Sequence, residues 1–287
     1  MSNLQHGLWI PNNPAYLGDF ATPTHAVEYA VTAEDSGWDG VFLADAMGGP
    51  GESYFDPYIT FASIAAETDS ISLGSFVIPL PRRQPWQVAS DLAVLDDLSN
   101  GRVILGTGLG AKSNYETTGI GYEPKRLGER FDEALEVIEQ LWMGDEVHYH
   151  GEHFGIDGLC LPRTPIQQPR IPIAMGCWWP NRKPIRRASR YDGFMPGWDP
   201  AYYGEEGELD PSAENLSSMM TDILEYYHEV AEEPGDIFIM IDWPEAPDDF
   251  VDHCRDLGMT WALNVCLLDD QSHELNLERI EEGPTGN

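Results

Sequence analysis

Short apolar segments alternate with longer amphipathic segments along this 287-residue chain, and this alternation constrains the fold more than any other feature. Segments 24–36, 57–67, 86–98 and 129–142 have helical periodicity, and Gly37 and Gly258 stand where helix C-caps are expected. Eight short apolar segments have the length and composition of buried parallel strands: 7–10, 40–44, 71–78, 102–106, 171–175, 193–195, 237–241 and 261–267. Eight strands alternating with helices predict an α/β fold, a single (β/α)8 barrel (TIM barrel) domain spanning residues 1–287.

Residues 143–170 fit neither pattern. Residues 147–154, with the sequence Val-His-Tyr-His-Gly-Glu-His-Phe, predict a β-hairpin, and Pro162, Pro165 and Pro169 mark an irregular return to the next strand. We expect this segment to be an insertion over the barrel mouth, and 199–212 to be a second loop there.

The charge is strongly one-sided, with 49 acidic residues, 16 basic residues and a net charge of −33. Carboxylates at this density repel one another at low salt, and strong salt screens that repulsion. We therefore interpret the composition as adaptation to a salt-rich cytoplasm. It disfavours nucleic acid and anionic membranes as partners.

The cysteines Cys160, Cys177, Cys254 and Cys266 form no CxxC pair, so neither a zinc site nor a disulfide scaffold is expected. No secretory signal pattern and no run of about 18 apolar residues is present, so we expect a cytoplasmic protein.

Barrel enzymes carry their chemistry at the carboxyl ends of the strands, so the residues there are the first candidates. Asp45 directly follows an apolar strand, where partial desolvation would let its carboxylate accept a proton or orient a ring hydroxyl. It is the expected catalytic residue. Tryptophans follow the later strands and would suit a planar aromatic ligand.

Two blocks carry a family resemblance: residues 73–86, and residues 95–110 with the pattern LDxLSxGRxxLGxGxG. They resemble the bacterial-luciferase-like flavin and deazaflavin oxidoreductases. The resemblance implies non-covalent FMN or coenzyme F420, used for hydride transfer or monooxygenation of a small organic substrate. It also implies a cis peptide between Phe76 and Val77.

The positions at the strand ends, together with this resemblance, indicate where ligands bind. The expected substrate contacts are Trp9, Asn12, Trp198 and Trp243. The expected cofactor contacts are Phe76, Val77, Thr107, Gly108, Gly110, Asn114, Gly176, Cys177, Trp178, Trp179, Asn181 and Arg182. Similar deazaflavin enzymes often carry His and Glu where this chain has Ala46 and Ala111, which argues against a sugar-phosphate dehydrogenase.

Five basic residues fall within 182–190 on a chain that otherwise avoids positive charge. A helix beginning near Asn181 or Arg182 would direct its free N–H groups and its first cations toward an anion. We expect Arg182 and the 176–181 backbone to hold the cofactor phosphate, with Arg187 and Arg190 structural. A helix face that tethers acidic neighbours is the alternative.

Asp96, Ser99 and Arg102 bracket a predicted helix end and strand start, where Arg102 would satisfy terminal carbonyls. A non-catalytic ligand-binding barrel stays open as an alternative function. A metal-dependent hydrolase is the other, because His148, His150 and His153 cluster in sequence, although they do not follow strands. We expect a homodimer or a higher homo-oligomer.

Overall fold

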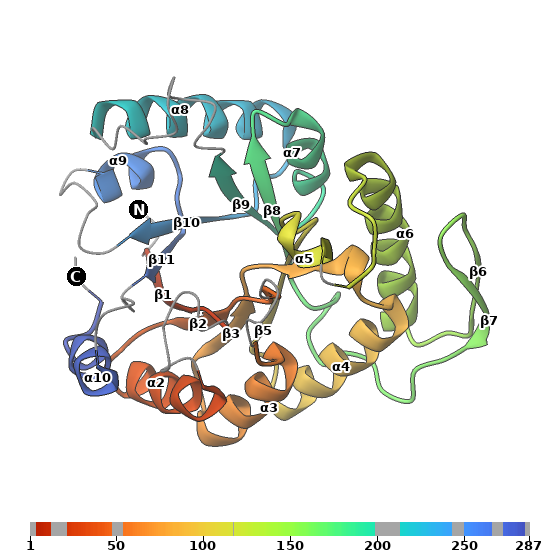
Figure 1. Cartoon of the computed structure of the whole chain (residues 1–287), viewed down its shortest axis with the longest axis horizontal. Helices are drawn as coiled ribbons and strands as arrows, with labels where there is room; N and C mark the ends of the chain where they lie inside the picture. The colour runs from red at the N-terminus through yellow and green to blue at the C-terminus, as the bar shows by residue number, and fades with distance from the viewer. Residues whose placement is uncertain are drawn as a thin grey trace.

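Parallel strands pair side by side around the centre of the molecule and close into a ring (Figure 1). The computed structural model describes residues 4–12, 22–47, 54–116, 118–198, 213–242, 250–265 and 272–284. Within them the strands of the ring are β1 (Gln5–Ile10), β2 (Gly40–Leu43), β3 (Ser72–Ser75), β4 (Ile78–Pro79), β5 (Val103–Gly108), β8 (Ile173–Trp179), β9 (Gly193–Trp198), β10 (Asp236–Asp242) and β11 (Trp261–Val265). Neighbours follow the order β3-β2-β1-β11-β10-β9-β8-β5, and β3 also pairs with β5. Because β4 continues β3 beside β5, the strands occupy eight places, which confirms the predicted barrel.

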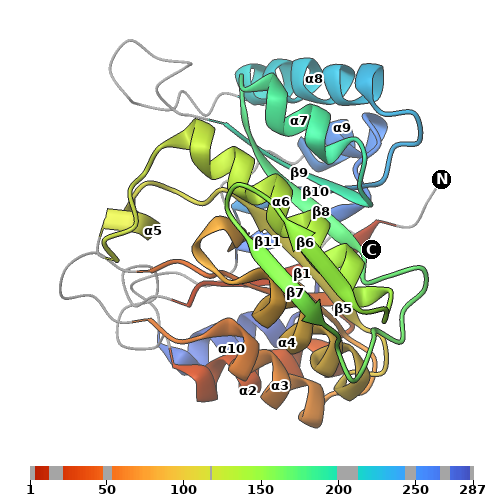
Figure 2. The same cartoon turned by 90° about the vertical axis from the view of Figure 1, so that its right-hand side faces the viewer.

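Helices surround the ring on its outer side (Figures 1 and 2). They are α2 (Pro23–Asp35), α3 (Pro57–Glu67), α4 (Pro85–Leu98), α5 (Ser113–Glu116), α6 (Pro124–Trp142), α7 (Arg182–Ala188), α8 (Ala213–Val230), α9 (Phe250–Asp256) and α10 (His273–Glu281), with the 3-10 turn η2 (Leu80–Arg82). Gly37 and Gly258 have φ of +84° and +100°, as their predicted C-cap positions require. None of the described helices has the length and apolarity needed to cross a membrane.

The hairpin insertion forms β6 (Val147–His150) and β7 (Gly155–Leu159), as predicted, but it does not lie over the mouth. It packs outside the barrel against α6, where Glu133 accepts hydrogen bonds from the backbone of residues 152–154 (Figure 1). Phe154 contacts Trp86 at the start of α4. The predicted position is therefore wrong, because these contacts hold the hairpin to the helix layer.

The structural role predicted for Asp96 and Arg102 is confirmed. Arg102 donates to the carbonyls of Ala65, Thr68, Ile71 and Ser99, and so satisfies the carboxyl-terminal ends of α3 and α4. Asp96 is fully buried and accepts hydrogen bonds from the backbone N–H groups of residues 166 and 167, which fixes the return from the hairpin.

Aromatic side chains fill much of the interior of the barrel. Phe42, Phe238 and Trp261 pack together with ring centroids 5.3–5.8 Å apart, and each is almost fully buried. Glycines on the neighbouring strands make room for them, since a Cβ at Gly74 would lie 2.2 Å from the Phe42 ring. The barrel interior is therefore a packed core and not a channel.

Candidate active site

The carboxyl ends of the strands form one end of the barrel, the mouth, which lies on the side of α5 in Figure 2. Asp45 follows β2, Phe76 and Val77 separate β3 from β4, and Trp178 lies near the end of β8. Chemistry in barrels of this kind is carried at this end.

The peptide between Phe76 and Val77 is cis, which confirms the prediction for this bond. The backbone here comes close to β5: a Cβ on Gly106 would lie 1.6 Å from the Ser75 carbonyl oxygen, so only glycine fits. The Ser75 hydroxyl donates to the Gly106 carbonyl at 2.7 Å and accepts from its N–H at 3.0 Å. Trp9 donates its indole N–H to the Phe76 carbonyl at 3.3 Å. This interruption of the strand is therefore held firmly at the mouth.

Three glycines on adjacent strands line the mouth beside this interruption: Gly108 on β5, Gly176 on β8 and Gly197 on β9. We call them the glycine floor. A Cβ on Gly108 or Gly176 would lie 3.3 Å or 2.9 Å from a methyl group of Val77. A Cβ on Gly197 would have no neighbour closer than 3.6 Å. Val77 therefore covers Gly108 and Gly176, whereas at Gly197 the described chain would accommodate a Cβ in ordinary van der Waals contact.

Trp178 stands beside this floor. Its side chain is 54% exposed, and its ring atoms lie 3.8–3.9 Å from the position of a Cβ on Gly197. An exposed indole beside Gly197 and Val77 could form one side of a site for a planar ring.

The β5 to α5 connection borders the floor on the other side. Thr107 is buried, and its hydroxyl donates to the Ile78 carbonyl at 2.8 Å, so it supports the strands. Gly110 has φ of +75° and packs against Pro79. The Asn114 carboxamide makes no side-chain hydrogen bond within the described residues, so it is available to a ligand.

Residues 176–179 were predicted as a loop, and that prediction is wrong. They continue β8 and pair in register with residues 195–198 of β9. Alternation along a strand then directs Cys177 and Trp179 outward into the core beneath the helices, where both are buried. Burial raises the pKa of the Cys177 thiol, so it is inert at neutral pH.

Asp45 lies where the sequence predicted, with its side chain fully buried, but it is paired with two arginines. Arg83 donates from Nε to Oδ2 at 2.9 Å. Arg82 Nη2 lies 2.5 Å from Oδ1 as an ion pair and donates to the Asp45 carbonyl at 3.1 Å. Arg83 also donates to Asp56, the N-cap of α3, at 3.1 Å. Burial lowers the pKa of Arg83, but the hydrogen bond and charge of Asp45 outweigh it and raise that pKa above its ordinary value.

Both carboxylate oxygens of Asp45 are therefore engaged by guanidinium groups of the chain itself. Arg82 and Arg83 are adjacent in a chain that has few basic residues. This feature of the sequence could have identified them as site residues.

Of the predicted substrate contacts, Asn12 has a structural role at the mouth. It is fully buried, donates to the Phe55 carbonyl at 2.9 Å and accepts from the Ala46 N–H at 3.0 Å, so its carboxamide is used within the chain. Trp9 is half-buried at the mouth. Trp198 ends β9, and its side chain, like Trp243, lies outside the described residues.

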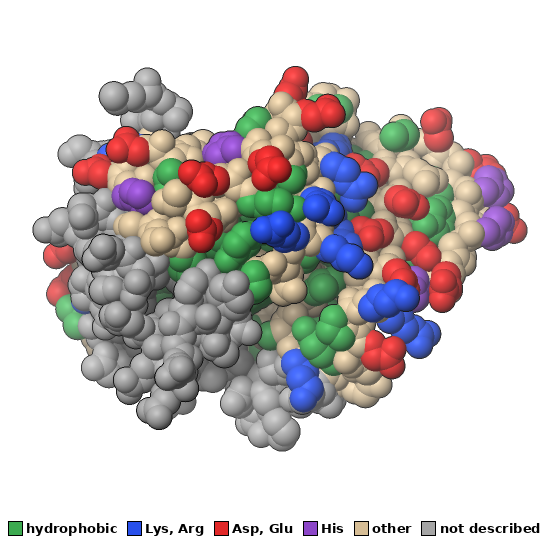
Figure 3. Space-filling model, turned by 90° about the horizontal axis from the view of Figure 1, so that it is seen from above, with side chains coloured by type: hydrophobic (Ala, Val, Ile, Leu, Met, Phe, Trp, Pro, Cys, Tyr) green, Lys and Arg blue, Asp and Glu red, His purple; other side chains and the backbone are tan. Residues whose placement is uncertain are grey.

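The helix predicted near Asn181 is α7, with Asn181 as its N-cap. The guanidinium of Arg182 lies over the Tyr226 ring, 4.8 Å from its centroid, and Arg186 donates to the Tyr226 hydroxyl at 2.8 Å. Arg187 pairs with Asp132 on α6, which confirms its predicted structural role. Figure 3 shows Lys and Arg side chains gathered on the face that carries α7.

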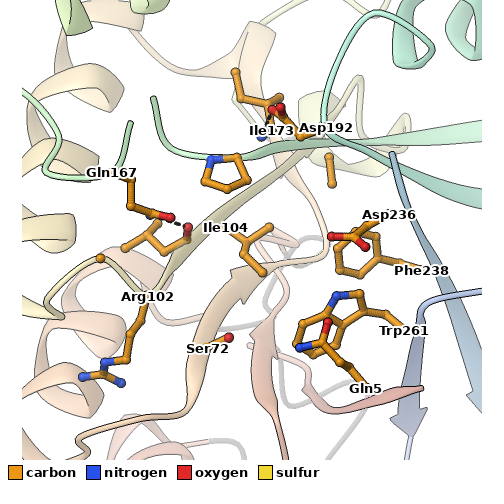
Figure 4. Close-up of a pocket in the computed structure, with 14 residues that line it drawn as sticks. Gln5, Ser72, Arg102, Ile104, Gln167, Ile173, Asp192, Asp236, Phe238 and Trp261 are labelled. Atoms are coloured by element: carbon orange, nitrogen blue, oxygen red, sulfur yellow. Dashed lines mark hydrogen bonds between the residues drawn. The ribbon is translucent and has the colours of Figure 1, made fainter. Parts of the chain in front are cut away.

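The opposite end of the barrel has a hollow of about 240 Å³ (Figure 4). Gln5, Ser72, Asp236, Phe238 and Trp261 line it, at or near the first residues of their strands. Burial, and then the charge of Asp192, raise the pKa of Asp236. In barrels this end serves stability, so we place the active site at the mouth.

The histidines of the hairpin do not form a metal site. His148 contacts Glu146 and Asp157 at 2.9 Å and 2.8 Å on the exposed hairpin. No group of three or more potential ligands is found in the part of the chain that the structure describes.

Comparisons with known proteins agree with this architecture. Residues 5–209 match the family described as luciferase-like monooxygenase. An F420-dependent glucose-6-phosphate dehydrogenase of Microbacterium testaceum is 31% identical over 196 residues, 64% of this chain and 56% of that protein. The chain spans about half the length of the first curated relatives it matches.

Two solved structures share the fold at 16% sequence identity. A monooxygenase from Streptomyces bottropensis has a TM-score of 0.76, with 96% of each chain covered. An F420-dependent secondary alcohol dehydrogenase, solved with an F420-acetone adduct, has a TM-score of 0.75, with 98% of each chain covered. Because the family match extends over more than half of the sequence and the barrel has the same architecture, this chain belongs to the luciferase-like monooxygenase family.

Proposed function

We propose that this protein is an oxidoreductase that binds FMN or coenzyme F420 non-covalently at the barrel mouth and acts on a small organic substrate. The Gly197 end of the glycine floor carries this proposal, because the described chain would accommodate a Cβ there and an exposed indole lies beside it. Membership of the family and the F420-dependent relatives support it. The bound cofactor would supply hydride transfer or oxygen activation, and the protein supplies orientation and electrostatics.

The mouth residues fit such a ring. Val77 covers Gly108 and Gly176, so a ring would lie against Val77, Gly197 and Trp178, and only at Gly197 would it come close to the backbone. The Asn114 carboxamide, which makes no hydrogen bond to the part of the chain that the structure describes, could donate to a ring or side-chain oxygen.

The cofactor phosphate is assigned to the start of α7. Arg182 is stacked on Tyr226 and makes no ion pair within the described residues, so its charge is oriented and not neutralised. A phosphate here would meet Arg182 and the free N–H groups of the first turn.

Asp45 acts in this proposal as a positioning residue. It holds Arg82 and Arg83 at the mouth and joins the end of β2 to the β4–α4 connection.

Titration of the purified protein with FMN and with F420 in molar KCl, followed by absorbance and fluorescence, tests the proposal. One of the two cofactors should bind saturably. Gly197→Val should weaken that binding at least about tenfold, because the added methyl groups occupy the floor. The matched control is Gly155→Val on the hairpin, where a Cβ would have no neighbour within 4 Å, and this variant should bind like the parent.

Binding of neither cofactor would overturn the proposal. So would equal binding by both variants, since the floor would then not be the site. A barrel that binds the cofactor without turnover is a second candidate, favoured by the engagement of Asp45 with two arginines. It predicts that bound cofactor is not reduced or reoxidised by any substrate pool.

A further inference from the structure

The lysines of this acidic chain are concentrated in two neighbouring connections that leave the barrel mouth. All three, Lys112, Lys125 and Lys183, are exposed and lie in the connections that follow the adjacent strands β5 and β8. Lys125 and Lys183 are the second residues of α6 and α7. Figure 3 shows Lys and Arg side chains gathered on the face that carries α7. A composition that avoids lysine elsewhere therefore retains it beside the mouth.

The first turns of α6 and α7 face each other. Arg187 on α7 donates to Asp132 at 2.9 Å and to the Gly128 carbonyl at 3.4 Å, so α7 lies against this side of α6. Lys183 lies one turn before Arg187 on the same side of α7. Lys125 lies one turn before Gly128 on the corresponding side of α6. The two lysines are therefore placed on facing sides of neighbouring helices.

Four exposed cations occupy the first turns of these helices, and we call them the basic rim: Lys125, Arg126, Arg182 and Lys183. Residues 124–128 and 181–191 contain no Asp or Glu. Lys125 Nζ lies 3.8 Å from Glu129, a weak contact between side chains that are 89% and 49% exposed. Within the part of the chain that the structure describes, the other three make no ion pair, and the exposed Glu123 pairs with none of them. The rim thus differs from Arg187, whose charge is used within the protein.

On the basis of the cofactor site proposed above, we infer that the basic rim binds the oligoglutamate tail of coenzyme F420, so that F420 and not FMN is the cofactor of this chain. FMN ends at its phosphate, whereas F420 continues beyond its phosphate into a chain of glutamates. The rim begins at Arg182, to which the phosphate is assigned, and continues through Lys183 to the first turn of α6.

The chemistry of the rim fits such a tail. Charge-assisted hydrogen bonds to carboxylates require cations that are not already paired, and the rim supplies them beyond the phosphate. Lysine carries a compact charge on a flexible stem, which suits a chain of carboxylates without one fixed geometry. FMN has no group beyond its phosphate that would use these cations.

The test is fluorescence titration of the full chain, over a series of KCl concentrations, with F420, with the same deazaflavin lacking its glutamates, and with FMN. At the lowest KCl concentration at which the parent is folded, F420 should bind at least about tenfold more tightly than the form without glutamates. This difference should shrink as KCl rises, because salt screens exposed charges. FMN should bind more weakly than F420.

Charge reversal tests the rim itself. Lys125→Glu and Lys183→Glu should each weaken F420 binding at least about fivefold and leave the form without glutamates unaffected. Arg190→Glu is the matched control, because it makes the same charge change at an exposed position beyond the other end of α7 and should alter neither affinity. Circular dichroism establishes that each variant is folded, and the comparison of the two F420 forms needs no variant.

Equal binding of the two F420 forms by the parent overturns the inference. So does an equal loss of both forms in the lysine variants, or the same loss in Arg190→Glu. A preference for FMN also overturns it and leaves the proposed function intact, whereas binding of no cofactor at all removes both.

Discussion

Replacing Asp45 with asparagine separates a structural role of this carboxylate from a role as a proton acceptor. Asn keeps the volume of the side chain and removes its charge. Arg82 and Arg83 would then lose the anion that they share, 2.5 Å and 2.9 Å away. Among the described residues, Asp56 would remain as the carboxylate that pairs with Arg83.

The size of the effect follows from burial. The side chains of Asp45, Arg82 and Arg83 are 0%, 7% and 22% exposed, so solvent screens these pairs only weakly. Breaking a buried pair by removing one partner costs about 3–5 kcal/mol. For 287 residues the unfolding entropy at the midpoint is about 0.6 kcal/mol/K, so Asp45→Asn should lower the thermal midpoint by about 5–8 °C.

Calorimetry of the parent and the variant at fixed pH in molar KCl measures this shift. The control is Asp97→Asn, because the Asp97–Arg163 pair joins side chains that are 40% and 64% exposed. Such a surface pair contributes about 0–1 kcal/mol, so its loss should move the midpoint by less than about 2 °C. If Asp45→Asn melts like the parent, the carboxylate does not hold the arginines, and a role in proton transfer regains support.

Other perturbations test the salt, phosphate and pH arguments. The thermal midpoint of the parent should rise as KCl increases from dilute to molar, because screening relieves carboxylate repulsion; a flat or falling midpoint would remove the halophilic interpretation. Arg182→Ala should weaken FMN or F420 binding by about ten- to a hundredfold and leave riboflavin unaffected, whereas Arg190→Ala should change neither; equal effects would place the phosphate elsewhere. Burial opposes a low pKa for Glu34, but hydrogen bonds from the backbone of residues 69–71 outweigh it and lower that pKa. The stabilisation by Glu34 is therefore full above its ordinary pKa of 4.5 and lost as pH falls through the lowered value, so the midpoint difference between the parent and Glu34→Gln should shrink from pH 6 to pH 3.

The order of strands and helices was predictable because burial leaves a periodic pattern in the sequence. Segments 57–67 and 86–98 match α3 and α4 to within one residue. The start of α6 at Pro124 was missed by five residues, since its first turn is polar and contains Gly128, so it shows no apolar stripe. The sequence of residues 176–179 does not predict a strand, because Gly, Cys, Trp and Trp do not alternate between apolar and polar side chains. The hydrogen-bonded pairing with β9 nevertheless extends through them.

The contacts that define the mouth were not predictable from spacing. Asp45 and Arg83 are 38 residues apart and meet only because β2 and β4 end at the same side of the barrel. Nothing in the local sequence says that both ends of the Asn12 carboxamide are used by residues 46 and 55. Sequence position could place these side chains at the mouth, but their partners decide whether they face a ligand or support the loops.

The glycines of the barrel interior have two different roles. The distance from a Cβ at each glycine to its nearest neighbour distinguishes them. A Cβ at Gly74 would overlap the Phe42 ring at 2.2 Å, so that glycine exists to admit an aromatic side chain of the protein itself. At Gly197 a Cβ would meet nothing within 3.6 Å, so packing against the described chain does not require a glycine there. A glycine in a strand costs conformational entropy and contributes no side chain to packing. A strand therefore keeps a glycine mainly where other atoms approach its backbone closely. Within the described residues no atom comes so close to Gly197, and the exposed Trp178 ring lies beside it, so this is where the proposed planar cofactor would come nearest to the strand.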